Sequence, residues 1–102
     1  MMTRLLLTAL LLATISACVG RPADEATGKE IFLQLCAGCH GDSLQGGLGP
    51  SLGTGSNAAS QPDDFLTATI SLGRGRMPSF QSSLTEDQVD LLVGFIRQEQ
   101  GR

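Results

Sequence analysis

The chain has 102 residues, a formal net charge of −3, thirteen Gly and four Phe, with neither Trp nor Tyr. Its acidity argues against binding to nucleic acid or to an anionic lipid surface, because both carry dense negative charge. The length allows one small domain, whose core would be marginal unless something staples or fills it.

The first 17 residues have the pattern of a cleaved signal peptide. A single basic residue precedes an apolar run from Leu5 to Ile15, which is too short to span a bilayer as a helix. The run ends in Ile15-Ser16-Ala17-Cys18, which resembles the bacterial lipobox, whose Cys receives a diacylglycerol thioether before cleavage on its N-terminal side. We therefore predict a lipoprotein signal peptide over 1–17 and a lipidated Cys18. The alternative is ordinary cleavage that leaves Cys18 as a free thiol.

We expect residues 18–23 to form a lipidated tether and residues 24–102 to form the folded domain. Removal of the signal peptide would leave six basic residues against ten acidic ones. A domain this small with so few aromatic side chains needs further apolar bulk, which a buried cofactor would supply.

The five residues Cys36-Ala37-Gly38-Cys39-His40 spell C-x-x-C-H, the attachment signature of a c-type haem. Two thiols three positions apart can form thioethers with the vinyl groups of one porphyrin, and the next imidazole is then held under the iron. A ligating imidazole nitrogen must be unprotonated. The motif therefore predicts one haem c bound covalently through Cys36 and Cys39, with His40 as an axial ligand.

Three other interpretations of these cysteines have less support. A thioredoxin-type dithiol requires a βαβ setting, and no alternating β-branched run precedes Cys36. A zinc site usually has four ligands, and beyond the pair the sequence offers only His40 and Cys18. A disulfide between Cys36 and Cys39 would close a loop too small to stabilise the fold much.

The remaining pattern is helical, with no strand signal of any strength. We predict helices over 24–35 and 62–72, the second capped by Ser60 or Gln61 and stopped by Gly73. Gly28 lies in the first helix, where the missing side chain would let another helix approach closely.

A third helix is the best marked. It begins at Thr85, which forms a capping box with Gln88, and it stops at Gly101.

Two Gly-rich stretches, 41–61 and 73–80, lack helical periodicity. A loop as long as 41–61 in a small domain needs a reason, and folding over one face and edge of a haem is such a reason. The second loop contains Met77, the one Met outside the signal peptide. Its thioether is a soft ligand for haem iron, and the alternative is gap-filling in the core. Because the chain has a single His, His40 and Met77 are the predicted axial pair.

Together these features resemble the small bacterial class I c-type cytochromes over about residues 24–100. The matching segments, in family order, are Gly28 and Phe32, Cys36 to Gly41, Gly49 to Leu52, Met77-Pro78 and Leu91 to Phe95.

The resemblance implies an all-α, class I cytochrome c fold of three to four helices wrapped around one covalently bound haem. It implies that the first and last helices cross at Gly28, Phe32 and Phe95. It also implies that the carbonyl of Pro50 accepts the second imidazole N–H of His40.

The chain also departs from this family pattern. It lacks the Tyr and Trp with which relatives often bind a haem propionate, and Arg74, Arg76 or Gln45 could substitute. It lacks the Lys-rich face of the mitochondrial members, so docking by acidic patches of a partner is not expected.

The resemblance further implies a one-electron carrier, not an enzyme. We expect it to be exported and lipid-anchored to a bacterial membrane, facing the periplasm or the cell exterior. There it would relay electrons between a quinol-oxidising complex or dehydrogenase and a terminal oxidase or reductase. The alternatives are a haem-bearing subunit of a larger oxidoreductase, and a haem enzyme or gas sensor with a labile Met77.

Overall fold

The computed structural model describes residues 20–102, so the predicted signal peptide and Cys18 lie outside the described residues. In this part of the chain, the only β structure is an isolated bridge between Arg74 and Met77. None of the helices here has the length and hydropathy of a membrane span. The all-α prediction is confirmed. The elements are α1 (Gly28–Leu35), α2 (Ala37–His40), the 3₁₀ turn η1 (Ala58–Ser60), α3 (Asp63–Leu72) and α4 (Glu86–Glu99).

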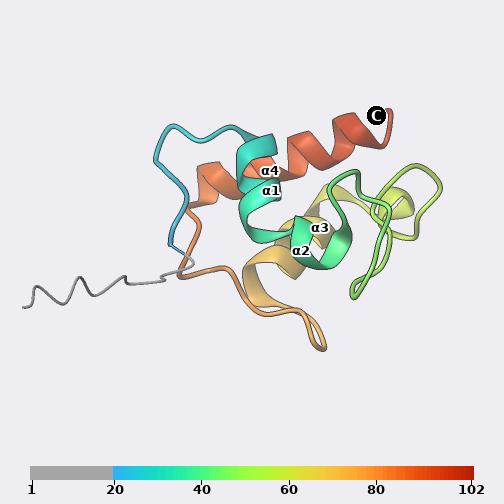
Figure 1. Ribbon diagram of the computed structural model, residues 1–102, viewed down its shortest axis with the longest axis horizontal. Coiled ribbons are helices and arrows are strands. Elements are labelled where there is room, and N and C mark those ends of the chain that lie inside the picture. The colour runs from blue at the N-terminus through green and yellow to red at the C-terminus, as the bar shows by residue number, and fades with distance from the viewer. Residues whose placement is uncertain (1–19) are drawn as a thin grey trace, which may run out of the picture.

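Helices α1 and α4 cross at close range, as Figure 1 shows. A Cβ on Gly28 would lie 2.2 Å from the carbonyl oxygen of Leu91 and 2.9 Å from Cβ of Phe95. Beside this contact, the rings of Phe32 and Phe95 pack with their centroids 5.4 Å apart. The expected crossing is therefore present, and the missing side chain of Gly28 is what lets the two backbones approach.

Helix α1 begins at Gly28, and the predicted start at Asp24 is wrong. Thr27 is the N-cap: its hydroxyl accepts the N–H of Glu30 at 3.1 Å, and the Glu30 carboxylate accepts the N–H of Thr27 at 3.3 Å. This reciprocal capping box determines the first turn. Asp24 and Glu25, which suggested an earlier start, both precede the cap.

Helix α3 begins one residue later than predicted, at Asp63. Its N-cap is Pro62, which provides no side-chain hydrogen bond. Neither Ser60 nor Gln61 therefore caps this helix, and that prediction is wrong. The predicted stop is confirmed, because Gly73 is the C-cap with a φ of 77°.

Helix α4 has the predicted capping box. The Thr85 hydroxyl accepts the N–H of Gln88 at 3.2 Å, and the Gln88 side chain accepts the N–H of Thr85 at 3.0 Å. Gly101, with a φ of 78°, follows the C-cap residue as expected.

Residues 20–23, the described part of the predicted tether, lie on the domain. The Gln34 side chain donates to the carbonyl of Gly20 at 2.7 Å, and the Gln88 side chain donates to the carbonyl of Ala23 at 3.2 Å. Pro22 between them is buried. This segment is thus part of the packed structure.

Candidate haem site

The C-x-x-C-H motif occupies the end of α1 and the one-turn helix α2. Cys36 is the C-cap of α1 and donates its N–H to the carbonyl of Phe32 at 2.9 Å. The carbonyl of Cys36 in turn accepts the N–H of His40 at 3.0 Å. Cys36 and His40 are buried, whereas Cys39 is exposed. The motif is therefore a single turn anchored directly on a core helix.

The first part of the Gly-rich loop 41–61 folds back onto this turn. Gly46 donates its N–H to the carbonyl of His40 at 2.7 Å, and Gly49 donates to the carbonyl of Cys39 at 2.8 Å. Leu44, with a φ of 63°, is almost fully buried in the core. Because the last carbonyls of a helix have no partner within it, these hydrogen bonds both cap α2 and order the loop.

The imidazole of His40 is held by the same loop. Its Nδ1 lies 2.8 Å from the carbonyl oxygen of Pro50. A carbonyl can only accept, so Nδ1 is the donor, and in the neutral imidazole Nε2 is then the nitrogen without a proton. Within residues 20–102 the ring makes no other hydrogen bond. The contact that the resemblance implied for Pro50 is therefore present, and it leaves Nε2 in the form a metal requires.

Gly49 is a further residue of this site, and the sequence analysis assigned it no role. A Cβ at this position would lie 3.0 Å from Cε1 and 3.1 Å from Nδ1 of His40. The glycine thus gives the imidazole its space on the loop side. The sequence feature that could have indicated this role is the position of Gly49 directly before Pro50.

Met77 lies in a tight turn just after α3. Arg74 and Met77 exchange backbone hydrogen bonds of 3.1 and 2.9 Å. A Cβ on Gly73 would lie 2.7 Å from the carbonyl oxygen of Met77. The turn can therefore be this tight only because residue 73 has no side chain. The Met77 side chain is half-buried and packs against the core. Its pairing with His40 on one iron stays a prediction.

The surroundings of the cysteines do not favour the other interpretations. Burial, together with the neighbouring Cys39, raises the pKa of the Cys36 thiol from 9.0 to about 11, whereas a redox dithiol needs a lowered pKa. Residues 20–102 contain no group of three His, Cys, Asp or Glu side chains placed to hold a metal ion. Cys36 and Cys39 are both free thiols, with no disulfide between them.

A buried guanidinium joins the far end of loop 41–61 to α4. Arg97 donates from Nε to the carboxylate of Asp63 at 2.7 Å. From Nη1 it donates to the carbonyl of Ala58 at 3.1 Å, and from Nη2 to the carbonyl of Gln61. Loop 41–61 is thus held by hydrogen bonds at both ends, to α2 at its start and to Arg97 of α4 at its end.

The three candidates for a haem propionate differ in their present contacts. The Gln45 amide oxygen accepts hydrogen bonds from the N–H and the hydroxyl of Ser43. The Arg74 guanidinium lies 5.0 Å from the ring centroid of Phe65, and Arg76 is exposed. Which of these groups would bind a propionate stays a prediction.

Comparison with known proteins agrees with this geometry. The family model for cytochrome c oxidase, cbb3-type, subunit III matches residues 23–96. The chain belongs to the cytochrome c family. Cytochrome c55X of Stutzerimonas stutzeri is 41% identical over 81 residues, which cover 76% of this chain and 71% of that protein. Cytochrome c55X of Pseudomonas aeruginosa is 39% identical over 71 residues, covering 68% of this chain and 59% of that protein.

A solved structure supports the fold of this cytochrome. The c-type cytochrome NirC superposes with a TM-score of 0.60 at 36% identity, covering 70% of this chain and 85% of that one. The class I fold and the role as an electron-transfer protein, not itself an enzyme, are thereby confirmed, and the family implies haem c. Further relatives are named as subunits of a nicotinate dehydrogenase, a cbb3-type cytochrome c oxidase and a menaquinol:cytochrome c reductase, and one as a quinohemoprotein alcohol dehydrogenase. The chain covers 7–31% of the length of these proteins.

Proposed function

We propose that this cytochrome carries one electron at a time on a single haem c, attached by thioethers to Cys36 and Cys39. His40 and Met77 are the axial ligands. The observation that carries the proposal is the 2.8 Å contact between Nδ1 of His40 and the carbonyl of Pro50. When bound, the haem supplies the exchange between Fe(III) and Fe(II).

The residues around His40 fit a bound haem. The carbonyl of Pro50 accepts from Nδ1, the ring nitrogen that would not bind the metal. Such an acceptor selects the tautomer and raises the basicity of the other ring nitrogen, Nε2. Pro50 is well suited to this role, because it has no N–H of its own and a fixed φ. The missing side chain of Gly49 leaves room for the ring beside Cε1 and Nδ1. Groups of the chain itself thus fix the orientation of the imidazole.

Met77 completes the proposed site from a separate turn. A neutral thioether favours Fe(II) more than a second imidazole would, so the His/Met pair raises the reduction potential. An iron held by both His40 and Met77 would have no open position for a substrate. This arrangement supports electron transfer over catalysis or gas binding.

Replacing Met77 tests the ligation. We expect M77A to lose the weak ferric absorption band that reports iron–sulfur bonding, to bind CO rapidly, and to have a lowered reduction potential. E99A, at an exposed position near the end of α4, is the control and should leave all three unchanged. An unaltered band in M77A would show that Met77 is not a ligand.

We further propose that a lipid on Cys18 confines this cytochrome to the outer face of a bacterial membrane. Its donor there would be a quinol-oxidising complex or dehydrogenase, and its acceptor a terminal oxidase or reductase. Confinement raises the effective concentration of such partners. Relatives that are subunits of these kinds of complex support this assignment.

The same relatives favour a second candidate, a fixed electron-transfer subunit of a larger oxidoreductase. Purification under mild detergent separates the two. Recovery in constant ratio with a catalytic subunit would indicate the fixed subunit, whereas recovery alone would indicate a free carrier.

A further inference from the structure

We propose that residues 20–23 form a docked strap that orients this cytochrome on its membrane. The corner of the domain around Gly20 and Gln34 faces the phospholipid headgroups, and loop 41–61 faces away from them. The inference deepens the proposed function and rests on the lipid at Cys18.

The first support is the pair of hydrogen bonds that seat the strap. Gln34, on α1, donates to the carbonyl of Gly20 at 2.7 Å. Gln88, on α4, donates to the carbonyl of Ala23 at 3.2 Å. The Gln88 side chain is itself positioned by the capping box of α4. Both amides donate to backbone carbonyls, so the strap is positioned at its two ends by two different helices.

The second support is the short length of chain between the lipidated Cys18 and the docked segment. Only Val19 separates Cys18 from Gly20, and two extended residues span at most about 7 Å. The lipidated residue is thus confined to a small volume around a fixed point of the domain. A free tether over 18–23 would instead span about 20 Å and let the domain rotate.

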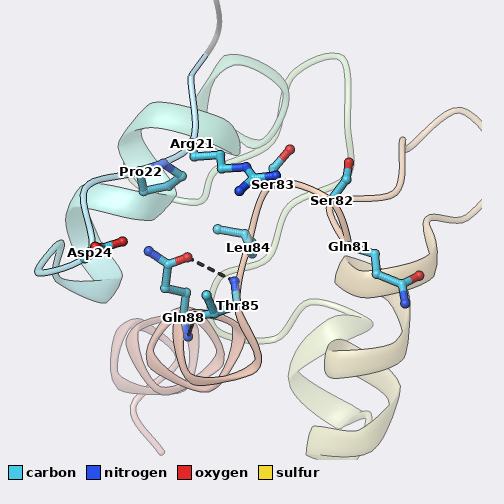
Figure 2. Close-up of a pocket in the computed structure, with 9 residues that line it drawn as sticks. All are labelled: Arg21, Pro22, Asp24, Gln81, Ser82, Ser83, Leu84, Thr85 and Gln88. Atoms are coloured by element: carbon cyan, nitrogen blue, oxygen red, sulfur yellow. Dashed lines mark hydrogen bonds between the residues drawn. The ribbon is translucent and has the colours of Figure 1, made fainter.

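The third support is the chemistry of the surface beside the strap. Arg21 is exposed, and next to it lies a hollow of about 270 Å³. Figure 2 shows Arg21 on the same side of this hollow as Ser83 and Ser82, with Asp24 on the opposite side. Hydroxyl and guanidinium donors suit the phosphate oxygens of a headgroup layer.

The orientation follows from the position of the strap in the fold. Figure 1 shows the blue segment that begins the described chain at one side of the domain and most of loop 41–61, in green to yellow, at the other. A strap docked as described therefore directs the loop that covers His40 toward the aqueous phase. Partner proteins at the surface would then meet a constant face of this cytochrome.

Polarised absorption of the haem in oriented phosphatidylcholine bilayers tests the strap. We expect the lipidated, haem-loaded protein to be dichroic, with one haem tilt. Q34A should lose part of the dichroism, because Gly20 is released, while bound amount and haem spectrum stay the same. Q98A, at an exposed position of α4, should keep the full dichroism.

A flexible Gly-Ser insertion between Val19 and Gly20 is the second variant, since it leaves the domain untouched. It should remove the dichroism completely. Isotropic absorption by the bound wild-type protein would overturn the strap, as would equal dichroism with and without the insertion. Failure of the wild-type protein to bind, or undiminished binding of C18S, would instead disprove the lipid anchor and the strap with it.

Discussion

Gly49 and Pro50 lie outside the C-x-x-C-H motif, yet they determine the tautomer and the position of the His40 ring within it. The carbonyl of Pro50 selects the tautomer of His40, and Gly49 leaves room for the ring in that position. Each acts through backbone or through the absence of a side chain. Only the contact between Pro50 and His40 could be anticipated from the resemblance to a family.

The G49A variant tests this packing. Its Cβ would lie 3.0 Å from Cε1 of His40, so the ring must shift by a few tenths of an ångström and its bond to Pro50 must lengthen. We expect a loss of about 1 kcal/mol in the free energy of unfolding and an altered electron paramagnetic resonance spectrum of the ferric haem. G94A, on α4 and outside the haem motif, is the control, because its Cβ would meet nothing within 4 Å. Equal spectra for the two variants would contradict the prediction.

Among the secondary-structure elements, the helix boundaries follow mostly from local sequence. The capping box of α4 was correctly predicted because all of its partners lie within four residues. The equivalent box at Thr27 was missed because Asp24 and Glu25 offered an earlier start. Both signals are local, and the reciprocal pair of hydrogen bonds at Thr27 decides between them.

The crossing of α1 and α4 can be tested at Gly28. A Cβ there would meet the backbone oxygen of Leu91 at 2.2 Å, and two core helices would have to separate. We expect G28A to lower the free energy of unfolding by about 2–3 kcal/mol in denaturant titrations. The matched control is G94A on α4, where a Cβ meets nothing within 4 Å. Greater helix propensity should stabilise G94A by up to about 1 kcal/mol.

Arg97 connects α4, α3 and loop 41–61, and its contributions can be separated. In R97A the loop carbonyls of Ala58 and Gln61 lose their donor, and we expect a loss of about 2–4 kcal/mol in unfolding free energy. D63N removes only the ion pair, whose carboxylate side is 69% exposed, and should cost less than about 1 kcal/mol. Similar losses for R97A and D63N would show that the ion pair is the main contribution.

For the whole molecule, the proposed lipid anchor at Cys18 can be tested. We expect C18S to move this cytochrome from the membrane fraction to the soluble fraction, because the acyl chains supply the anchoring free energy at about 0.8 kcal/mol per buried CH₂. The haem spectrum should not change, since Cys18 lies far in sequence from the haem motif. Ultracentrifugation and absorption spectroscopy measure both. A variant that still sediments with membranes would disprove the lipobox assignment.

The sequence by itself determined the chemistry of this cytochrome. The single His and the loop that contains Met77 predict the iron ligands. The C-x-x-C-H motif predicts the haem itself through residue type and short spacing, and the apolar periodicity indicates an all-α domain. These features depend on neighbours within a few positions along the chain, so they can be recognised without a fold.

The tertiary structure alone decided the contacts between segments distant in the chain. Gln88 and Ala23 are 65 positions apart, and Arg97 meets Ala58 across 39 positions. Such pairs follow from how the helices pack, because no local periodicity encodes which loop will face which side chain. The contacts of residues 20–23 and of Arg97 are therefore determined by the tertiary packing.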